Sequence, residues 1–195
     1  MAKTWKYDFD LAKFTRAIEA NPQDHRAYKD RGNVYYRKGL YDLAVADYTR
    51  SIELKPDFFL GYNNRGNVYQ KTGQYELAIS DYDRAISLKP ENGMPYNNRG
   101  FTFLLMGRLD EAERDLRKSL DLNEDNIYAL NSMAELYAAR ANAAEACAWL
   151  KKAIQKGYNN WNYLRESKTY EKIRGEACFR ELLFRHGQHS GTKER

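Results

Sequence analysis

The sequence predicts an all-α protein, a solenoid of stacked helix pairs, and two observations support this prediction. First, three segments match when the chain is shifted by 34 residues: Arg31-Gly32-Asn33-Val34-Tyr35, Arg65-Gly66-Asn67-Val68-Tyr69 and Arg99-Gly100-Phe101-Thr102-Phe103. Second, prolines recur at the same interval, at Pro22, Pro56 and Pro90. A fixed period of this length is typical of repeat architectures, in which each repeat packs only against its neighbours.

Length and composition agree with such an array. The chain has 195 residues, of which 43% are hydrophobic, and its mean hydropathy is −0.85. It therefore has enough apolar side chains for a core, while much polar surface remains for an elongated array. No run approaches the ~20 apolar residues that a membrane-spanning helix needs. We therefore expect no membrane segment. The N-terminal residues also lack the apolar segment of a secretory signal, so we expect no such signal.

Each repeat is expected to contain two helices separated by a turn. In the first repeat, one helix carries Tyr28, Gly32 and Tyr35 on one face and ends near Gly39. Gly39 is expected to be a left-handed residue that caps this helix. The second helix should end before Pro56, because a residue that precedes proline leaves the α region.

Glycines inside the first helices predict a close helix approach. Glycine in a helix interior costs up to ~1 kcal/mol relative to alanine, so its recurrence needs a reason. Gly32, Gly66 and Gly100 recur at one position of the repeat. The small partners expected opposite them are the alanines at another repeated position, Ala44, Ala78, Ala112 and Ala146.

The spacing of these residues resembles the tetratricopeptide repeat (TPR), a helix-turn-helix unit of 34 residues. In the first unit the resemblance rests on Tyr28, Gly32, Tyr35, Ala44, Tyr48 and Pro56. It covers roughly residues 7–160 and implies a right-handed superhelical solenoid of antiparallel helix pairs. Arginine replaces the usual leucine beside the glycine in three units, a variant associated with bacterial members of the family.

The period and the resemblance divide the chain into seven segments. We expect an N-terminal half-repeat with a single helix, three regular repeats, a degenerate fourth repeat, C-terminal capping helices and a disordered tail. The corresponding residues are 1–24, then 25–58, 59–92 and 93–126, then 127–160, 161–186 and 187–195.

An ion pair is expected between the two helices of each regular unit. An aspartate follows the repeated arginine after sixteen residues, which gives the pairs Arg31–Asp47, Arg65–Asp81 and Arg99–Asp115. In the fourth unit Met133 and Trp149 take these places, so both charges disappear together. The alternative is that these residues are independent surface charges.

The resemblance also implies where a ligand would bind. In the family the opposite stripe of each first helix lines a concave groove, and asparagine side chains there offer two donors and one acceptor to the backbone of an extended peptide. Phe101 and Leu105 would add apolar contacts. The predicted groove residues are Lys29, Asn33, Asn63, Asn64, Asn67, Asn97, Asn98, Phe101, Leu105 and Asn131. Two alternatives are surface asparagines without a ligand, and a groove covered by the C-terminal segment of the chain itself.

A narrower version is a carboxylate clamp for the acidic C-terminal tails of chaperones. Family members with this function use two lysines, two asparagines and an arginine. Lys29, Asn33 and Asn64 match three of these places, whereas Met94 and Asn98 occupy the other two. The resemblance to a clamp is therefore incomplete.

The half-repeat at the N-terminus allows a second function. Because its helix has no first helix to pack on, Trp5 and Phe9 are expected to be partly exposed. They would belong either to a frayed cap or to an edge through which two copies associate.

The remaining patterns point away from catalysis. We find no phosphate-binding glycine loop, no metal-spaced cluster and no nucleophile with a base nearby in sequence, so no enzyme activity, cofactor or metal is expected. The net charge of +5 is mild, and without a basic stripe we do not expect nucleic-acid binding. Cys147 and Cys178 fall outside any paired spacing, which favours buried thiols, a reducing compartment and a cytoplasmic location.

The leading hypothesis is a non-catalytic protein-interaction scaffold with an unidentified peptide or protein partner, and the second is a homo-oligomerising module.

Overall fold

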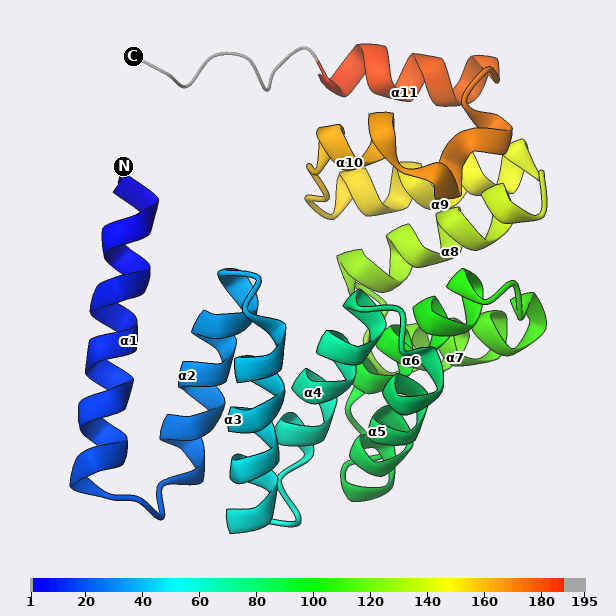
Figure 1. Cartoon of the computed structure of the whole chain (residues 1–195). Coiled ribbons are helices and arrows are strands. Elements are labelled where there is room, and N and C mark those ends of the chain that lie inside the picture. Colours follow the sequence, from blue (N-terminus) through cyan, green and yellow to red (C-terminus); the bar gives the residue numbers. More distant parts are fainter. Residues whose placement is uncertain (1, 188–195) are drawn as a thin grey trace. The chain divides into compact units, whose positions relative to one another are not determined.

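The structure is a computed structural model that describes the backbone of residues 2–187 and the side chains of residues 7–185. It is divided into two compact units, residues 1–102 and 103–195, which we call the N-terminal unit and the C-terminal unit. All regular elements of the described residues are helices, as predicted (Figure 1). Of the tail predicted at 187–195, residues 188–195 lie outside what the structure describes, as does the side chain of Trp5.

The N-terminal unit contains five complete helices and most of a sixth. They are α1 (Ala2–Ala20), α2 (His25–Arg37), α3 (Tyr41–Leu54), α4 (Phe59–Lys71), α5 (Tyr75–Leu88) and α6 (Gly93–Leu105). Helix α2 packs along α3, and α4 packs along α5, as two antiparallel pairs (Figure 1). Helix α1 packs on α2, and α3 packs on α4, so the helices from α1 to α5 each contact the next helix in the sequence.

Local signals in the sequence explain where these helices begin and end. The side chain of Asp24 accepts hydrogen bonds from the backbone amides of Arg26 and Ala27, which caps the start of α2. Gly39 has a φ of +75° after α2, which confirms the predicted left-handed cap. Lys55, before Pro56, leaves the helical region and ends α3.

The glycines inside the first helices do meet a close neighbour, but not the expected alanines. A Cβ atom built on Gly32 would lie 2.8 Å from Cε1 of Tyr48, and one built on Gly66 would lie 2.8 Å from Cε1 of Tyr82. The two tyrosine rings are buried. The prediction of a close approach is therefore confirmed, and the nearest partners are the rings of Tyr48 and Tyr82 in place of the predicted Ala44 and Ala78.

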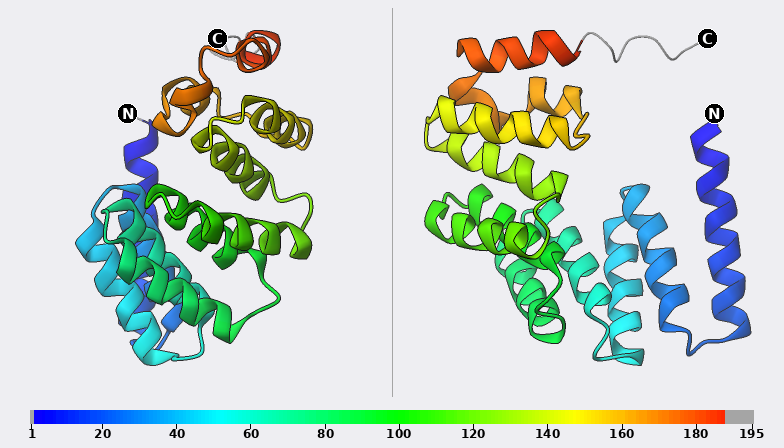
Figure 2. Two further views of the ribbon diagram at one scale, coloured as in Figure 1. Left: turned by 90° about the vertical axis from the view of Figure 1, so that its right-hand side faces the viewer. Right: turned by 180° about the vertical axis from the view of Figure 1, so that it is seen from behind.

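The C-terminal unit contains three long helices that pack on one another in sequence, followed by a terminal segment of shorter helices that packs on the last two of them. Its elements are α7 (Leu109–Leu122), α8 (Ile127–Ala139), α9 (Ala143–Gln155), α10 (Trp161–Glu166), the 3-10 helix η1 (Lys168–Ile173) and α11 (Ala177–Gly187). Helix α8 packs on α7, α9 and η1, while α11 packs on α9 and α10. Figure 2 shows this terminal segment stacked against α8 and α9. Its core includes the fully buried side chains of Leu150, Leu164, Tyr170 and Phe179.

The turn after α8 departs from the repeat. The equivalent turns after α2, α4 and α6 place Gly39, Gly73 and Gly107 at φ values of +75°, +79° and +77°. One period after Gly107, Ala141 occupies this position with a φ of +58°. Alanine is rare in the left-handed region because its Cβ approaches the neighbouring carbonyl oxygen.

The two cysteines form a disulfide, so the prediction of two separate thiols is wrong. The Sγ atoms of Cys147 on α9 and Cys178 on α11 are bonded, with a Cα–Cα distance of 6.2 Å. The prediction failed because the sequence separation of 31 between the cysteines obscures the return of α11 onto α9. The argument for a reducing compartment, which depended on free thiols, therefore loses its basis.

None of the helices in the described part of the chain combines the length and the apolar character that crossing a bilayer would require.

Candidate functional site

Two of the predicted structural ion pairs join helices of the N-terminal unit. Arg31 on α2 donates from Nε to Oδ2 of Asp47 and from Nη2 to Oδ1, both at 2.8 Å. Arg65 on α4 makes the same two bonds to Asp81, also at 2.8 Å. The hydrogen bonds that these arginines donate to the carboxylates raise the pKa of both arginines. The structure thus brings both predicted pairs together.

Each of these arginines also contacts the preceding helix. Nη1 of Arg65 donates to Oγ1 of Thr49 on α3 at 3.0 Å, and Nη1 of Arg31 donates to Oγ1 of Thr15 on α1 at 3.4 Å. Each guanidinium therefore connects three consecutive helices. These bonds fix the rotation of α2 and of α4 about their own axes. The third predicted pair, Arg99 and Asp115, falls on different units and stays a prediction. Within the N-terminal unit, Arg99 pairs with Asp83.

The opposite face of α2, α4 and α6 carries a chain of hydrogen-bonded amides. We call it the asparagine ladder, and it consists of Asn33, Asn63, Asn64, Asn67, Asn97 and Asn98. Oδ1 of Asn33 accepts from Tyr48 Oη at 2.8 Å and from Asn64 Nδ2 at 3.0 Å. One period later, Oδ1 of Asn67 accepts from Tyr82 Oη at 2.8 Å and from Asn98 Nδ2 at 3.0 Å. Burial raises the pKa of Tyr48 and Tyr82, so both phenols stay neutral donors.

Two members of the ladder are buried and do not line a groove. Asn63 has no exposed surface, and its Oδ1 accepts from Asn98 Nδ2 at 3.0 Å while its Nδ2 donates to Asn64 Oδ1 at 3.2 Å. Asn97 is 9% exposed and donates to Asn98 Oδ1 at 3.3 Å. The prediction that Asn63 and Asn97 contact a ligand is wrong, because neighbouring helices close over them.

The remaining ladder residues differ in what they offer a ligand. Asn64 and Asn98 already use their Nδ2 groups within the ladder. By contrast, the Nδ2 groups of Asn33 and Asn67 donate to no side chain or carbonyl of the described residues, and both asparagines are only half-buried. Phe101 is also half-buried, and Lys29 forms an ion pair with Asp30. Leu105 is exposed in the C-terminal unit. The site therefore reduces to two equivalent amide donors held by buried tyrosines.

In the C-terminal unit the corresponding face of α8 is covered by the chain itself. Asn131 is 5% exposed, its Nδ2 donates to Glu135 Oε2 at 2.9 Å, and its Oδ1 accepts from Tyr170 Oη at 2.9 Å. Glu135 also accepts from Thr169 Oγ1 at 2.7 Å and from Tyr163 Oη. Burial raises the pKa of Glu135 to about 7. The prediction of Asn131 as a groove residue is wrong, because α10 and η1 occupy that face.

Sequence reasoning missed the role of Glu135, although its place on the inner face of α8 was a signal. The equivalent positions in α4 and α6 are Asn67 and Phe101, which carry no charge. A buried carboxylate at this position needs hydrogen-bond partners, and the nonperiodic segment after residue 160 supplies Tyr163 and Thr169. Among the described residues there is no group of three or more His, Cys, Asp and Glu side chains that could hold a metal ion.

Known proteins resemble this chain in sequence and in fold. A family model described as TPR repeat matches residues 32–73, and two models described as tetratricopeptide repeat match residues 59–92 and 81–114. No curated protein sequence is significantly similar to the chain.

Three solved structures illustrate the likeness of the fold. TTC0263, a thermophilic TPR protein of Thermus thermophilus, has a TM-score of 0.73 and 24% identity over 88% of this chain and 93% of that one. YrrB, described as a TPR protein with an unusual peptide-binding site, has a TM-score of 0.60 and 22% identity over 92% and 93%. The first TPR of Spaghetti (RPAP3), solved with the HSP90 peptide SRMEEVD, has a TM-score of 0.58 and 28% identity over 61% and 94%.

The repeated helix pairs, the Gly–Tyr packing between them and the three matching family models lead to one conclusion: this chain belongs to the tetratricopeptide repeat family.

Proposed function

We propose that this chain is a non-catalytic protein-interaction scaffold that binds an extended peptide along the asparagine ladder of the N-terminal unit. The observation that carries the proposal is the pair of uncommitted Nδ2 groups on Asn33 and Asn67. They lie at equivalent positions of α2 and α4, and their carbonyl oxygens are fixed by Tyr48 and Tyr82. Fixed donors on successive helices suit the backbone carbonyls of an extended chain, since little side-chain entropy is lost on binding.

Relatives with peptide ligands support this proposal. RPAP3 was solved with an HSP90 peptide, and YrrB is described as having a peptide-binding site. The ladder makes no use of side-chain charge, so we expect affinity for peptide backbone with modest preference for sequence. A half-buried Phe101 on α6 would add one apolar contact.

The test replaces the two donors without removing the acceptors that the tyrosines need. The variant Asn33→Asp/Asn67→Asp keeps an oxygen for Tyr48 and Tyr82 and turns each free donor into an acceptor. Peptides would first be selected from a random phage-displayed library on the full chain, and their affinities then measured by fluorescence polarisation. We expect at least tenfold weaker binding by the variant.

A charge-matched control separates the loss of donors from the added negative charge. Ala46→Asp/Ser80→Asp adds two carboxylates at exposed positions of α3 and α5. We expect this control to bind within about twofold of the original protein. Equal affinities for all three proteins would overturn the proposal.

The carboxylate clamp is a narrower alternative, and the geometry gives it little support. Lys29 is already paired with Asp30, and Asn64 Nδ2 already donates to Asn33. Titration with the peptide SRMEEVD as a free acid and as its C-terminal amide distinguishes the two modes. A clamp requires the free acid to bind much more tightly, whereas the ladder predicts similar affinities.

Self-association through the N-terminal half-repeat is the second candidate function, favoured by the exposure of Phe9. Its side chain is 65% exposed on α1. However, the equivalent residues Leu43 and Leu77 are 48% and 49% exposed on α3 and α5, so exposure at this position belongs to the repeat itself. Sedimentation of the Trp5→Ala/Phe9→Ala variant tests the idea: a concentration-dependent mass that disappears in the variant would establish it.

A further inference from the structure

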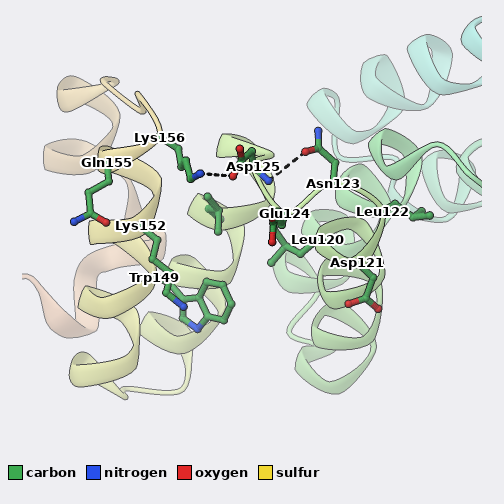
Figure 3. A pocket seen from close by; sticks show the side chains of 11 residues that line it. Leu120, Asp121, Leu122, Asn123, Glu124, Asp125, Trp149, Lys152, Gln155 and Lys156 are labelled. Atoms are coloured by element: carbon green, nitrogen blue, oxygen red, sulfur yellow. Dashed lines mark hydrogen bonds and ion pairs between the residues drawn. The ribbon is translucent and has the colours of Figure 1, made fainter.

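The C-terminal unit contains an open cleft of about 880 Å³, and none of the residues that line it belongs to the asparagine ladder. The end of α7, the loop that follows it, and α9 form its sides (Figure 3). Its lining includes Leu120, Asp121, Glu124, Leu130, Trp149 and Lys152.

The N-terminal unit shows what normally occupies this place in the repeat. Tyr62 on α4 lies two periods before Leu130. Its Oη donates to the backbone oxygen of Pro56 at 3.3 Å, in the loop after α3. The guanidinium carbons of Arg65 and Arg84 lie 5.8 and 5.9 Å from the centre of its ring, which places cations against the aromatic face. A tyrosine ring thus connects the loop to α5.

The fourth repeat has lost this ring and the arginine beside it. Leu130 replaces the tyrosine, and Met133 replaces the arginine beside it; both are buried. Leucine is too short to reach the loop as Tyr62 does. Trp149 replaces the aspartate of the regular ion pair and forms an aromatic wall. The substitutions therefore leave a hollow where the regular repeat places a phenol.

Other groups that hold the ring in the regular repeat are retained. Lys152 stands at the position of Arg84, and its Nζ lies 4.3 Å from the centre of the Trp149 ring. The backbone oxygen of Glu124 stands at the position of the Pro56 oxygen. The cleft thus keeps a cation and a carbonyl acceptor at the positions that contact Tyr62 in the N-terminal unit.

The lining of the cleft includes three acidic side chains, Asp121, Glu124 and Asp125, and two basic ones, Lys152 and Lys156. Asp125 forms an ion pair with Lys156 at 2.5 Å (Figure 3). Asp121 and Glu124 are exposed and make no ion pair within the part of the chain that the structure describes. Their negative charge favours basic groups on a ligand, and it disfavours a ligand with acidic flanks.

We propose that this cleft binds a tyrosine side chain from a partner protein, in a segment with basic residues beside the tyrosine. The partner's ring takes the place that Tyr62 fills in the N-terminal unit, stacked against Trp149, with its hydroxyl donating to the Glu124 carbonyl oxygen. Its basic neighbours pair with Asp121 and Glu124. This binding site is independent of the asparagine ladder.

The direct test follows the Trp149 indole by NMR while the full chain is titrated with the peptide acetyl-Arg-Tyr-Arg-amide. The indole signal is assigned with Trp149→Phe. We expect a saturable shift of this signal, and at least tenfold weaker binding of acetyl-Arg-Ala-Arg-amide and of acetyl-Glu-Tyr-Glu-amide. An unmoved indole signal, or equal binding of the alanine peptide, would overturn the proposal.

The decisive variant is Leu130→Tyr, which restores the ring of the regular repeat. We expect it to fold with an unchanged or raised melting temperature and to lose peptide binding at least tenfold. The matched control, Leu43→Tyr, makes the same change on the exposed face of α3 and should bind like the original protein. A folded Leu130→Tyr protein that binds normally would refute the site.

A second variant keeps the test open if Leu130→Tyr does not fold. Asp121→Lys/Glu124→Lys changes two exposed side chains and reverses their charge. It should prefer acetyl-Glu-Tyr-Glu-amide over acetyl-Arg-Tyr-Arg-amide, and an unchanged preference would contradict the proposal.

Discussion

Arg65 binds Asp81 through two parallel hydrogen bonds of 2.8 Å, Nε to Oδ2 and Nη2 to Oδ1, while its third nitrogen donates to Thr49. The side chains of Arg65 and Asp81 are only 19% and 8% exposed. Three helices of the N-terminal unit therefore depend on a pair of charges that is largely removed from water. Such a pair is costly to break, because the remaining charge has no replacement partner.

We expect Asp81→Ala to lower the free energy of unfolding of the N-terminal unit by about 3–5 kcal/mol, since it leaves Arg65 partly buried without its acceptor. Urea unfolding followed by circular dichroism measures this loss. Ser80→Ala, the neighbouring exposed position, should change stability by less than about 0.5 kcal/mol. A loss below about 1 kcal/mol for Asp81→Ala would show that the two residues act as independent surface charges.

The double variant Arg65→Met/Asp81→Leu should be much less damaging than Asp81→Ala. Replacing a whole buried ion pair by apolar residues is often neutral or stabilising. The fourth repeat has made a similar exchange, with Met133 and Trp149 in these places. If the double variant is as unstable as the single one, then the bonds of Arg65 to Thr49 and to the tyrosine rings contribute more than its bond to Asp81.

Gly66→Ala should destabilise the N-terminal unit although alanine is the better helix former. The new Cβ would lie 2.8 Å from Tyr82, whose ring is fully buried and whose hydroxyl holds Asn67. Overpacking costs about 1–3 kcal/mol, which exceeds the gain of up to ~1 kcal/mol in helix propensity. We expect a net loss of about 1–2 kcal/mol in urea unfolding. The control Gly175→Ala adds a Cβ with no atom within 4 Å and should be nearly neutral.

Ala141→Gly should stabilise the C-terminal unit. Ala141 has a φ of +58°, a conformation that costs an L-residue about 1–2 kcal/mol. Glycine removes this cost, but it also increases the conformational entropy of the unfolded chain, which offsets part of the stabilisation. We therefore expect a net gain of about 0.5–1 kcal/mol and a higher melting temperature. The reverse change in the preceding repeat, Gly107→Ala at a φ of +77°, should lower the melting temperature.

The periodic part of the sequence predicted those features that depend on helix faces and turns. It identified the helix pairs, the left-handed Gly39 and the close approach at Gly32, because each follows from residue type and spacing. It could not show that Asn63 is buried while Asn67 is half-buried, since depth depends on how neighbouring helices close. It also could not place Tyr170 or Cys178, because the segment after residue 160 has no period that fixes its return onto α8 and α9.

Glu135 makes the stability of the C-terminal unit depend on pH. Its carboxylate on α8 accepts from Thr169 on η1, Asn131 on α8 and Tyr163 on α10. The other titratable groups that interact with it are Tyr158 and Tyr170, whose pKa values burial raises, so they stay neutral. Burial outweighs the hydrogen bonds that favour the carboxylate, and it raises the pKa of Glu135 from 4.5 to about 7.

Because the folded state binds this proton more tightly than the unfolded state, the stabilisation is complete below pH 4.5 and is lost as the pH rises to about 7. A shift of this size corresponds to about 3 kcal/mol. We expect the free energy of unfolding of the C-terminal unit, followed by hydrogen exchange of α10 and η1, to fall over this range. In Glu135→Gln, which cannot titrate, the fall should disappear. If the variant keeps the same slope, then another group must bind the proton, and Glu135 is ionised in the folded protein throughout.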